Sequence, residues 1–140
     1  MKRLLLIILF VSQLSGCAGL GALALGSIVY YTSSQHKVAT VNIKAKADNV
    51  YHVAVDTIEN NPELEITSKD ERERVIKLVR GTTKDSYSVS IKISKLDAEH
   101  SQLILASDAR IDTDSHIASM KQGIFKICDD SKVECHLSRS

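Results

Sequence analysis

The sequence of 140 residues predicts an α+β domain with a single antiparallel sheet of about five strands and two helices packed on one face of it. Two patterns support this prediction. Several short segments alternate apolar and polar residues, as half-buried strands do, and two longer segments repeat apolar residues at every third or fourth position, as helices do. The order is strand, helix, four strands and helix, so we expect the domain to occupy residues 38–128.

The first strand and the first helix are expected at the start of this domain. Ala39, Val41 and Ile43 alternate with polar residues, as in a strand that buries one face. Asp48 or Asn49 can cap the helix that follows, because a short polar side chain satisfies free backbone amides. The apolar stripe of this helix consists of Val50, Val53, Ala54, Thr57 and Ile58.

Four strands and a second helix complete the predicted domain. The strands are expected at residues 64–68, 74–80, 87–93 and 102–111, with a charged turn at residues 69–73. The second helix should begin at Asp114 or Ser115. Its stripe consists of Ile117, Met120, Lys121, Ile124, Ile127 and Cys128. Residues 129–140 are expected to form a C-terminal tail.

The N-terminus has the composition of a secretory signal peptide. Two basic residues precede an apolar run from Leu4 to Val11, which is far shorter than the ~20 residues of a spanning helix. The segment Leu14-Ser15-Gly16-Cys17 resembles the lipobox of bacterial lipoproteins, whose cysteine is acylated and becomes the first residue of the mature protein. We therefore expect residues 1–16 to be removed and Cys17 to carry the lipid.

A lipidated Cys17 would anchor the domain to a membrane. Resemblance to the lipoprotein class implies several acyl chains, palmitate among them, and two or more chains anchor a protein stably. Ala18 follows the cysteine where some lipoproteins have aspartate, which in Gram-negative bacteria favours the outer membrane, here with the domain on the periplasmic face. Residues 17–37 would then be the lipidated cysteine, an apolar Gly/Ala tether and a short linker. The alternative is one transmembrane helix over residues 4–31.

Cys128 and Cys135 are predicted to form a disulfide, because the periplasm is oxidising. Seven residues of continuous helix would separate the two Cα atoms by ~10 Å, whereas a disulfide tolerates about 7 Å. The pairing therefore requires the last helix to end near Cys128 and Asp129 and the chain to fold back. A metal site that includes His136 is the alternative, although Cys-x6-Cys-His matches no standard zinc spacing.

Composition and motifs argue against several other functions. The 18 basic and 17 acidic side chains give a formal net charge of only +1, which gives no electrostatic case for binding nucleic acid. The segment Asp112–His116 lacks the glycine and glutamate that an EF-hand loop would require further along. His52, His100 and His116 have no sequence neighbours at catalytic or metal-ligand spacing. We therefore expect no enzyme, no metal and no cofactor.

The lipobox signal, the tether and the β-α-β-β-β-β-α order together resemble a family of small bacterial lipoproteins of unknown function. The matching stretches are Leu14 to Cys17, the tether from Ala18, the helix opening Asp48 to Tyr51 and the strand series Leu64 to Ile111. The element order is also similar to helix-grip domains in lipoprotein subunits of outer-membrane assembly machinery. This resemblance implies a fold and supplies no catalytic residues.

Two functional hypotheses follow from these observations. The first is a non-enzymatic, lipid-anchored envelope protein that binds another envelope protein through a strand edge or an open sheet face. The second is a carrier of a small apolar ligand held between the sheet and the helices. The second hypothesis requires an apolar cavity on the order of several hundred Å³.

Overall fold

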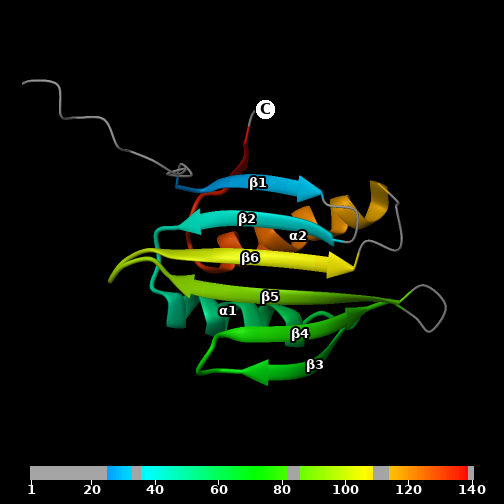
Figure 1. Cartoon of the computed structure of the whole chain (residues 1–140). Coiled ribbons are helices and arrows are strands. Elements are labelled where there is room, and N and C mark those ends of the chain that lie inside the picture. Colours follow the sequence, from blue (N-terminus) through cyan, green and yellow to red (C-terminus); the bar gives the residue numbers. More distant parts are fainter. Residues whose placement is uncertain (1–24, 33–35, 82–85, 109–113, 139–140) are drawn as a thin grey trace, which may run out of the picture.

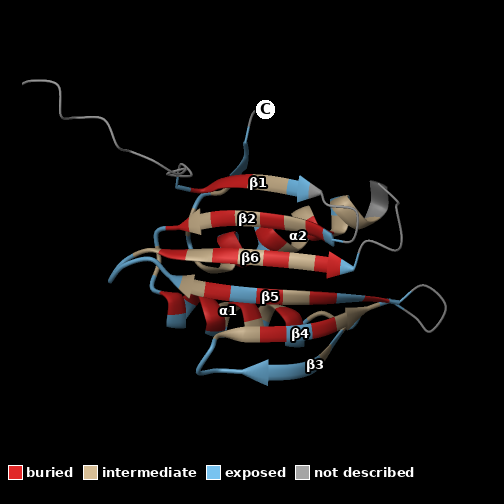
Figure 2. Ribbon diagram, in the orientation of Figure 1, coloured by how far each residue is buried: buried red, intermediate tan, exposed pale blue. Residues whose placement is uncertain are grey.

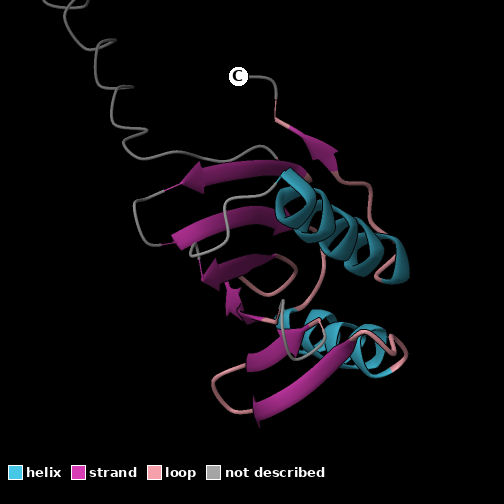
Figure 3. Ribbon diagram, turned by 90° about the vertical axis from the view of Figure 1, so that its right-hand side faces the viewer, coloured by secondary structure: helices cyan, strands magenta, loops and turns pink. Residues whose placement is uncertain are grey.

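The computed structural model describes residues 25–32, 36–81, 86–108 and 114–138. Within these ranges a seven-stranded sheet carries two helices on one face (Figures 1 and 3), which confirms the predicted α+β class. The elements are β1 (Ser27–Thr32), β2 (His36–Ile43), α1 (Ala47–Glu59), β3 (Leu64–Asp70), β4 (Val75–Arg80), β5 (Tyr87–Lys95), β6 (Ser101–Asp108), α2 (Asp114–Asp130) and β7 (His136–Leu137).

The strands lie side by side in the order β3-β4-β5-β6-β2-β1-β7. Strands β1 to β6 pair with antiparallel neighbours, and β7 pairs parallel to β1, so the sheet is mixed. The helix α1 follows β2 and α2 follows β6, and both cross the same face of the sheet (Figure 3). The predicted order of strand, helix, four strands and helix is present, and β1 and β7 extend the sheet beyond the expected five strands.

Strand β1 lies within residues 17–37, where the sequence predicts a tether and a linker, so the predicted domain boundary at residue 38 is corrected. Ile28 of β1 pairs with Val41 of β2, and its side chain is 1% exposed. The segment from Ile28 to Tyr31 is β-branched or aromatic, and such residues favour strands beside an available partner. Some of the apolar residues that the sequence assigned to a tether therefore form strand β1 of the sheet.

The helix α1 begins at Ala47, one residue before the predicted cap. Lys46 occupies the N-cap position and makes no side-chain capping hydrogen bond. Asp48 lies in the first turn, where its carboxylate accepts a 2.5 Å hydrogen bond from Arg74 Nε. This bond lowers the pKa of Asp48. The carboxylate therefore stabilises the positive end of the helix dipole and ties α1 to the turn that precedes β4.

Both helices bury an apolar face against the sheet, and Figure 2 shows the buried residues concentrated on the helices and the central strands. The helices contribute Ala47, Val50, Tyr51, Ala54 and Ile58 from α1, and Met120, Ile124, Ile127 and Cys128 from α2. Strands β5 and β6 alternate buried and more accessible side chains, as their sequence period predicts. The edge strand β3 is mostly exposed.

A disulfide joins Cys128 of α2 to Cys135, and their Cα atoms are 6.1 Å apart. The helix ends at Asp130, two residues beyond Cys128, and Lys132 adopts a φ of 60° that turns the chain. The backbone N–H of Val133 then donates a 3.0 Å hydrogen bond to the carbonyl of Cys128. The chain thus makes the reversal that the disulfide requires.

The returning chain places β7 beside the start of β1. The N–H of His136 donates to the carbonyl of Gly26 at 2.8 Å, and the N–H of Ser138 donates to that of Ile28 at 3.0 Å. Glycine is required at position 26, because φ is 75° and a Cβ would overlap the backbone carbonyl of Glu134. Of the segment 129–140, predicted as a tail, residues 129 and 130 therefore complete α2, and residues 136 and 137 add a strand to the sheet.

Among the described residues, no helix is long and apolar enough to cross a membrane. Cys17, predicted to carry the lipid, lies outside the described residues together with the predicted signal peptide.

Candidate functional site

A cavity of about 790 Å³ lies between the two helices and the inner face of the sheet. Its floor is apolar and is formed by Leu78 of β4, Tyr87, Val89 and Ile91 of β5, and Leu105 of β6. Val53 and Ile58 of α1 form one wall, and Met120 and Ile127 of α2 form the other. The floor and walls present hydrocarbon to whatever occupies the space.

The two helices meet near one end of this cavity. The hydroxyl of Thr57 in α1 donates a 2.9 Å hydrogen bond to Asp130 Oδ2, at the end of α2. Lys126 Nζ contacts the other oxygen of the same carboxylate at 2.5 Å. These bonds, that of Lys126 first, lower the pKa of Asp130. Thr57, Lys126 and Asp130 all border the cavity, so this bridge spans its two walls.

The strands of the floor are packed differently at their two ends. Ile93 of β5 pairs with Leu103 of β6, and their exposed fractions are 1% and 0%. Further along the same strands, Val89 and Leu105 are 7% and 5% exposed, and both line the cavity. The helices therefore seal one end of the central strands and leave the other end open to the cavity.

Polar groups surround the mouth of the cavity. Arg80 of β4 forms an ion pair with Glu63, with Nη2 and Oε2 2.9 Å apart. Asn60 and Asn61 follow α1, and their side chains hold the turn through the carbonyl of Asp56 and the N–H of Glu63. Across the mouth, α2 contributes Ser119, Gln122 and Lys126. An apolar floor with a polar rim suits a molecule that is largely apolar and has one polar end.

Gly123 lies in the middle of α2 and borders the cavity. A Cβ placed on this residue would have no heavy atom within 4 Å. The absence of a side chain at this position therefore adds to the free space. The position therefore accepts a Cβ without a clash.

Tyr87 of β5 contacts His116 in the first turn of α2. Their ring centroids are 4.4 Å apart, with the planes inclined at 48°. Tyr87 is buried and borders the cavity. The contact packs the start of α2 onto the start of β5.

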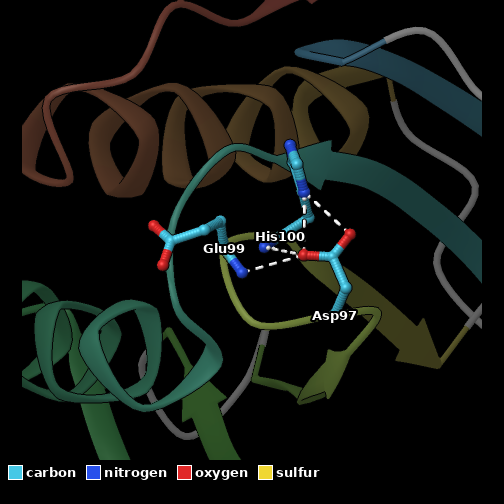
Figure 4. A network of polar contacts seen from close by, with 3 residues as sticks. All are labelled: Asp97, Glu99 and His100. Atoms are coloured by element: carbon cyan, nitrogen blue, oxygen red, sulfur yellow. Dashed lines mark hydrogen bonds and ion pairs between the residues drawn. The ribbon is translucent and has the colours of Figure 1, made fainter.

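The three histidines considered for catalysis lie on different elements. His52 is on the exposed side of α1, 3.9 Å from Glu71. His100 lies in the turn between β5 and β6 (Figure 4), where Nδ1 is 2.8 Å from Asp97 Oδ2. The N–H groups of Glu99 and His100 also donate to Asp97 Oδ1, at 2.8 and 2.9 Å. These bonds, that of Glu99 first, lower the pKa of Asp97 and fix the turn.

The metal sites considered from the sequence find no support in the described ranges. No three His, Cys, Asp or Glu side chains there are arranged to hold a metal ion. Cys135 is bonded to Cys128, so it supplies no thiolate beside His136. Of the segment Asp112–His116, residues 112 and 113 lie outside the described residues. The cavity residues were not singled out from the sequence, because their alternation indicates burial whether the facing space is filled or open.

Comparison of the sequence with known families gives a match over residues 1–106 to the family described as "Protein of unknown function (DUF3568)". The chain belongs to the DUF3568 family. The resemblance to a family of unknown function is thereby confirmed, and the family description adds no activity. Among curated proteins, none matches the sequence.

The fold of this DUF3568 protein is shared with a Thermobifida fusca protein solved by solution NMR. The TM-score is 0.51 at 12% identity, over 75% of this chain and 99% of that one. A START superfamily protein from Mycobacterium smegmatis is similar at a TM-score of 0.46 and 11% identity, over 69% and 94% of the two chains. Norcoclaurine synthase from Thalictrum flavum is similar at 0.44 and 16%, over 88% and 100%.

Proposed function

We propose that this DUF3568 protein binds a small, largely apolar ligand between its sheet and its helices. The cavity of about 790 Å³ is the observation that supports this proposal. Ligand-binding pockets of proteins have volumes of about 300–1,000 Å³, apolar linings and a few polar groups that orient the ligand. The second sequence hypothesis, a ligand carrier, therefore has stronger support than the first.

Packing physics gives a reason for this preference. Protein interiors are close-packed, and apolar side chains that face a void lose the contacts that stabilise them. Here Val89, Leu105 and Met120 lie beneath or beside a space large enough for a ligand. Filling that space with hydrocarbon would restore those contacts and remove more apolar surface from water.

The hypothesis that the protein binds another envelope protein has weaker support from the sheet edge. Among the described strands, β3 pairs with β4 alone and offers free backbone groups for strand addition. Its register with β4 shifts between Ile66 and Ser68, and Lys69 and Asp70 are exposed on it. Bulges and charged side chains on an edge strand disfavour pairing with another strand.

Membrane anchoring through Cys17 is part of the proposal. A lipid anchor would hold the cavity beside the outer membrane on its periplasmic face, where apolar molecules are concentrated. A Cys17→Ser variant should be released from the membrane fraction or remain unprocessed. Unchanged lipid labelling of that variant would contradict the anchor and leave the cavity proposal intact.

Binding to the cavity can be tested with a neutral fluorescent probe, N-phenyl-1-naphthylamine. We expect the full chain to show one saturable site and Gly123→Phe, which fills the open space on α2, to bind at least tenfold more weakly. Gly123→Ala leaves most of the space free, and Ala118→Phe adds the same ring at an exposed position on the same helix. Both controls should bind like the wild type. The leader segment is common to all four proteins, so it cannot produce the difference.

Two results would overturn the proposal. One is the lack of a saturable component in the wild type. The other is equal binding by Gly123→Phe and Ala118→Phe, which would place the probe outside the cavity.

A further inference from the structure

We infer that the cavity takes an apolar molecule with an uncharged polar end and discriminates against anionic amphipaths such as fatty acids. The inference rests on the proposed function, since it specifies the ligand class of the same cavity. It is based on which of the charged side chains that line the cavity already have ion-pair partners. These four side chains are Asp56, Arg80, Lys126 and Asp130.

Both cations at the cavity already have carboxylate partners. Arg80 is paired with Glu63 at 2.9 Å, and the Arg80 side chain is 25% exposed. Lys126 is paired with Asp130 at 2.5 Å, and Asp130 also accepts the hydrogen bond from Thr57. An anionic headgroup that recruited either cation would leave Glu63 or Asp130 without its partner. The existing pairs therefore compete with an incoming anion.

The remaining charge on the lining is negative. Within the described part of the chain, the carboxylate of Asp56 takes part in no ion pair or hydrogen bond, and it borders the cavity on the α1 side. A carboxylate-bearing ligand would place a second negative charge near it. Like charges at a binding site lower affinity, and such repulsion is a common source of specificity.

Uncharged hydrogen-bonding groups are available at the same mouth. Ser119 and Gln122 lie on the cavity side of α2, and within the described residues their side chains make no hydrogen bond. A hydroxyl and an amide can each donate and accept, so they can satisfy an alcohol, ketone or amide group of a ligand. These side chains can thus form hydrogen bonds with the neutral polar end of a ligand, and no ion pair has to be broken.

Competition against the neutral probe by decan-1-ol and decanoate tests this inference, because the two differ mainly in charge. At pH 8 and low ionic strength, where charge effects are least screened, we expect decanoate to displace the probe from the full chain at least tenfold less effectively than decan-1-ol. Glu63→Gln frees the Arg80 guanidinium. This variant should improve decanoate binding several-fold and leave decan-1-ol unchanged.

Glu65→Gln is the matched control. It makes the same change in net charge on β3, at an exposed position that does not line the cavity. It should alter neither competitor. A uniform gain in decanoate binding by both variants would reflect overall charge and would overturn the inference.

The two proposals fail in different ways. Equal displacement by decanoate and decan-1-ol, with probe binding still weakened in Gly123→Phe, would overturn the charge selectivity and keep the ligand cavity. Failure of both competitors and of the probe to bind would overturn the cavity proposal itself. Stronger binding of decanoate than of decan-1-ol would assign the cavity to anionic ligands and contradict the inference directly.

Discussion

The two ends of the central strands β5 and β6 form a natural comparison. At one end, Ile93 and Leu103 pair with each other and lie in a sealed interior. At the other end, Val89 and Leu105 belong to the floor of a large cavity. The strands, their register and their side-chain alternation are continuous between the two ends. What differs is how closely the helices cover them.

This difference suggests a division of roles along one sheet. The sealed end has the packing that a stable interior requires, and the open end has a volume and a lining suited to a ligand. The contact between Thr57 and Asp130 lies where the helices meet. Substitutions at the sealed end should therefore affect stability most, and substitutions around the cavity should affect binding most.

The largest expected effect comes from truncating the same residue at the two ends. Leu103→Ala should lower the free energy of unfolding by about 3–5 kcal/mol, because it leaves a new void in a filled interior. Leu105→Ala removes the same atoms beside an existing cavity, so we expect about 2 kcal/mol or less. Urea denaturation of the two variants measures the difference. Equal losses would show that the two ends are packed alike.

The disulfide should have the next largest effect, and it acts where the chain after α2 returns to the β1 edge of the sheet. Reduction of the bond between Cys128 and Cys135 should lower the free energy of unfolding by about 2.5 kcal/mol, from the chain entropy of a short loop. Hydrogen exchange should speed up at the amides of His136 and Ser138, which hold the returning chain to β1. Cys135→Ala should be insensitive to reductant. Free thiols in the unreduced, denatured protein would contradict the pairing.

Two glycines should respond in opposite directions to alanine. Gly123→Ala should raise the free energy of unfolding by up to about 1 kcal/mol, because alanine favours the helix and its Cβ meets open space. Gly26→Ala should lower it by at least about 1 kcal/mol, since φ is positive and the Cβ would overlap Glu134. Thermal denaturation gives the sign of each change. A destabilised Gly123→Ala would mean that the space beside α2 is filled.

The smallest effect is expected from acid. The pKa of Asp130 in the folded protein is lowered by its bonds from Lys126 and Thr57, so it lies below the value of about 3.9 of an unfolded chain. Its contribution to stability is therefore complete above that value and is lost as the pH falls through the folded pKa. Asp130→Asn should flatten the pH dependence of unfolding between about pH 5 and pH 2. An unchanged profile would contradict a role for this bridge.

Much of the fold could be predicted because the spacing of apolar residues along the sequence indicates which side chains of a strand or helix are buried. The alternation from Tyr87 to Ile93 and the spacing of Val50, Ala54 and Ile58 gave β5 and α1 directly. Strand β1 was missed because its apolar residues follow a signal-like segment and resemble a tether. Strand β7 is two residues long and forms where the chain returns beside β1, which periodicity cannot report.

The cavity could not be predicted from the sequence for a related reason. Val89 and Leu105 occupy the same alternating pattern as Ile93 and Leu103, so their sequence signals are equal. Whether a helix covers them depends on how α1 and α2 pack in three dimensions, through contacts such as that between Thr57 and Asp130, which are 73 residues apart. Gly123, which follows Met120 by three residues and precedes Ile127 by four on α2, is a local hint of missing volume among the lining residues.

Methyl NMR during a titration with decan-1-ol tests the central claim most directly. Ligand binding at the open end should shift the methyl signals of Val89, Leu105 and Met120, while those of Ile43, Ile93 and Leu103 stay in place. The same titration of Gly123→Phe should leave both groups unchanged. Equal shifts in the two groups, or shifts that persist in Gly123→Phe, would contradict a ligand site between the helices and the sheet.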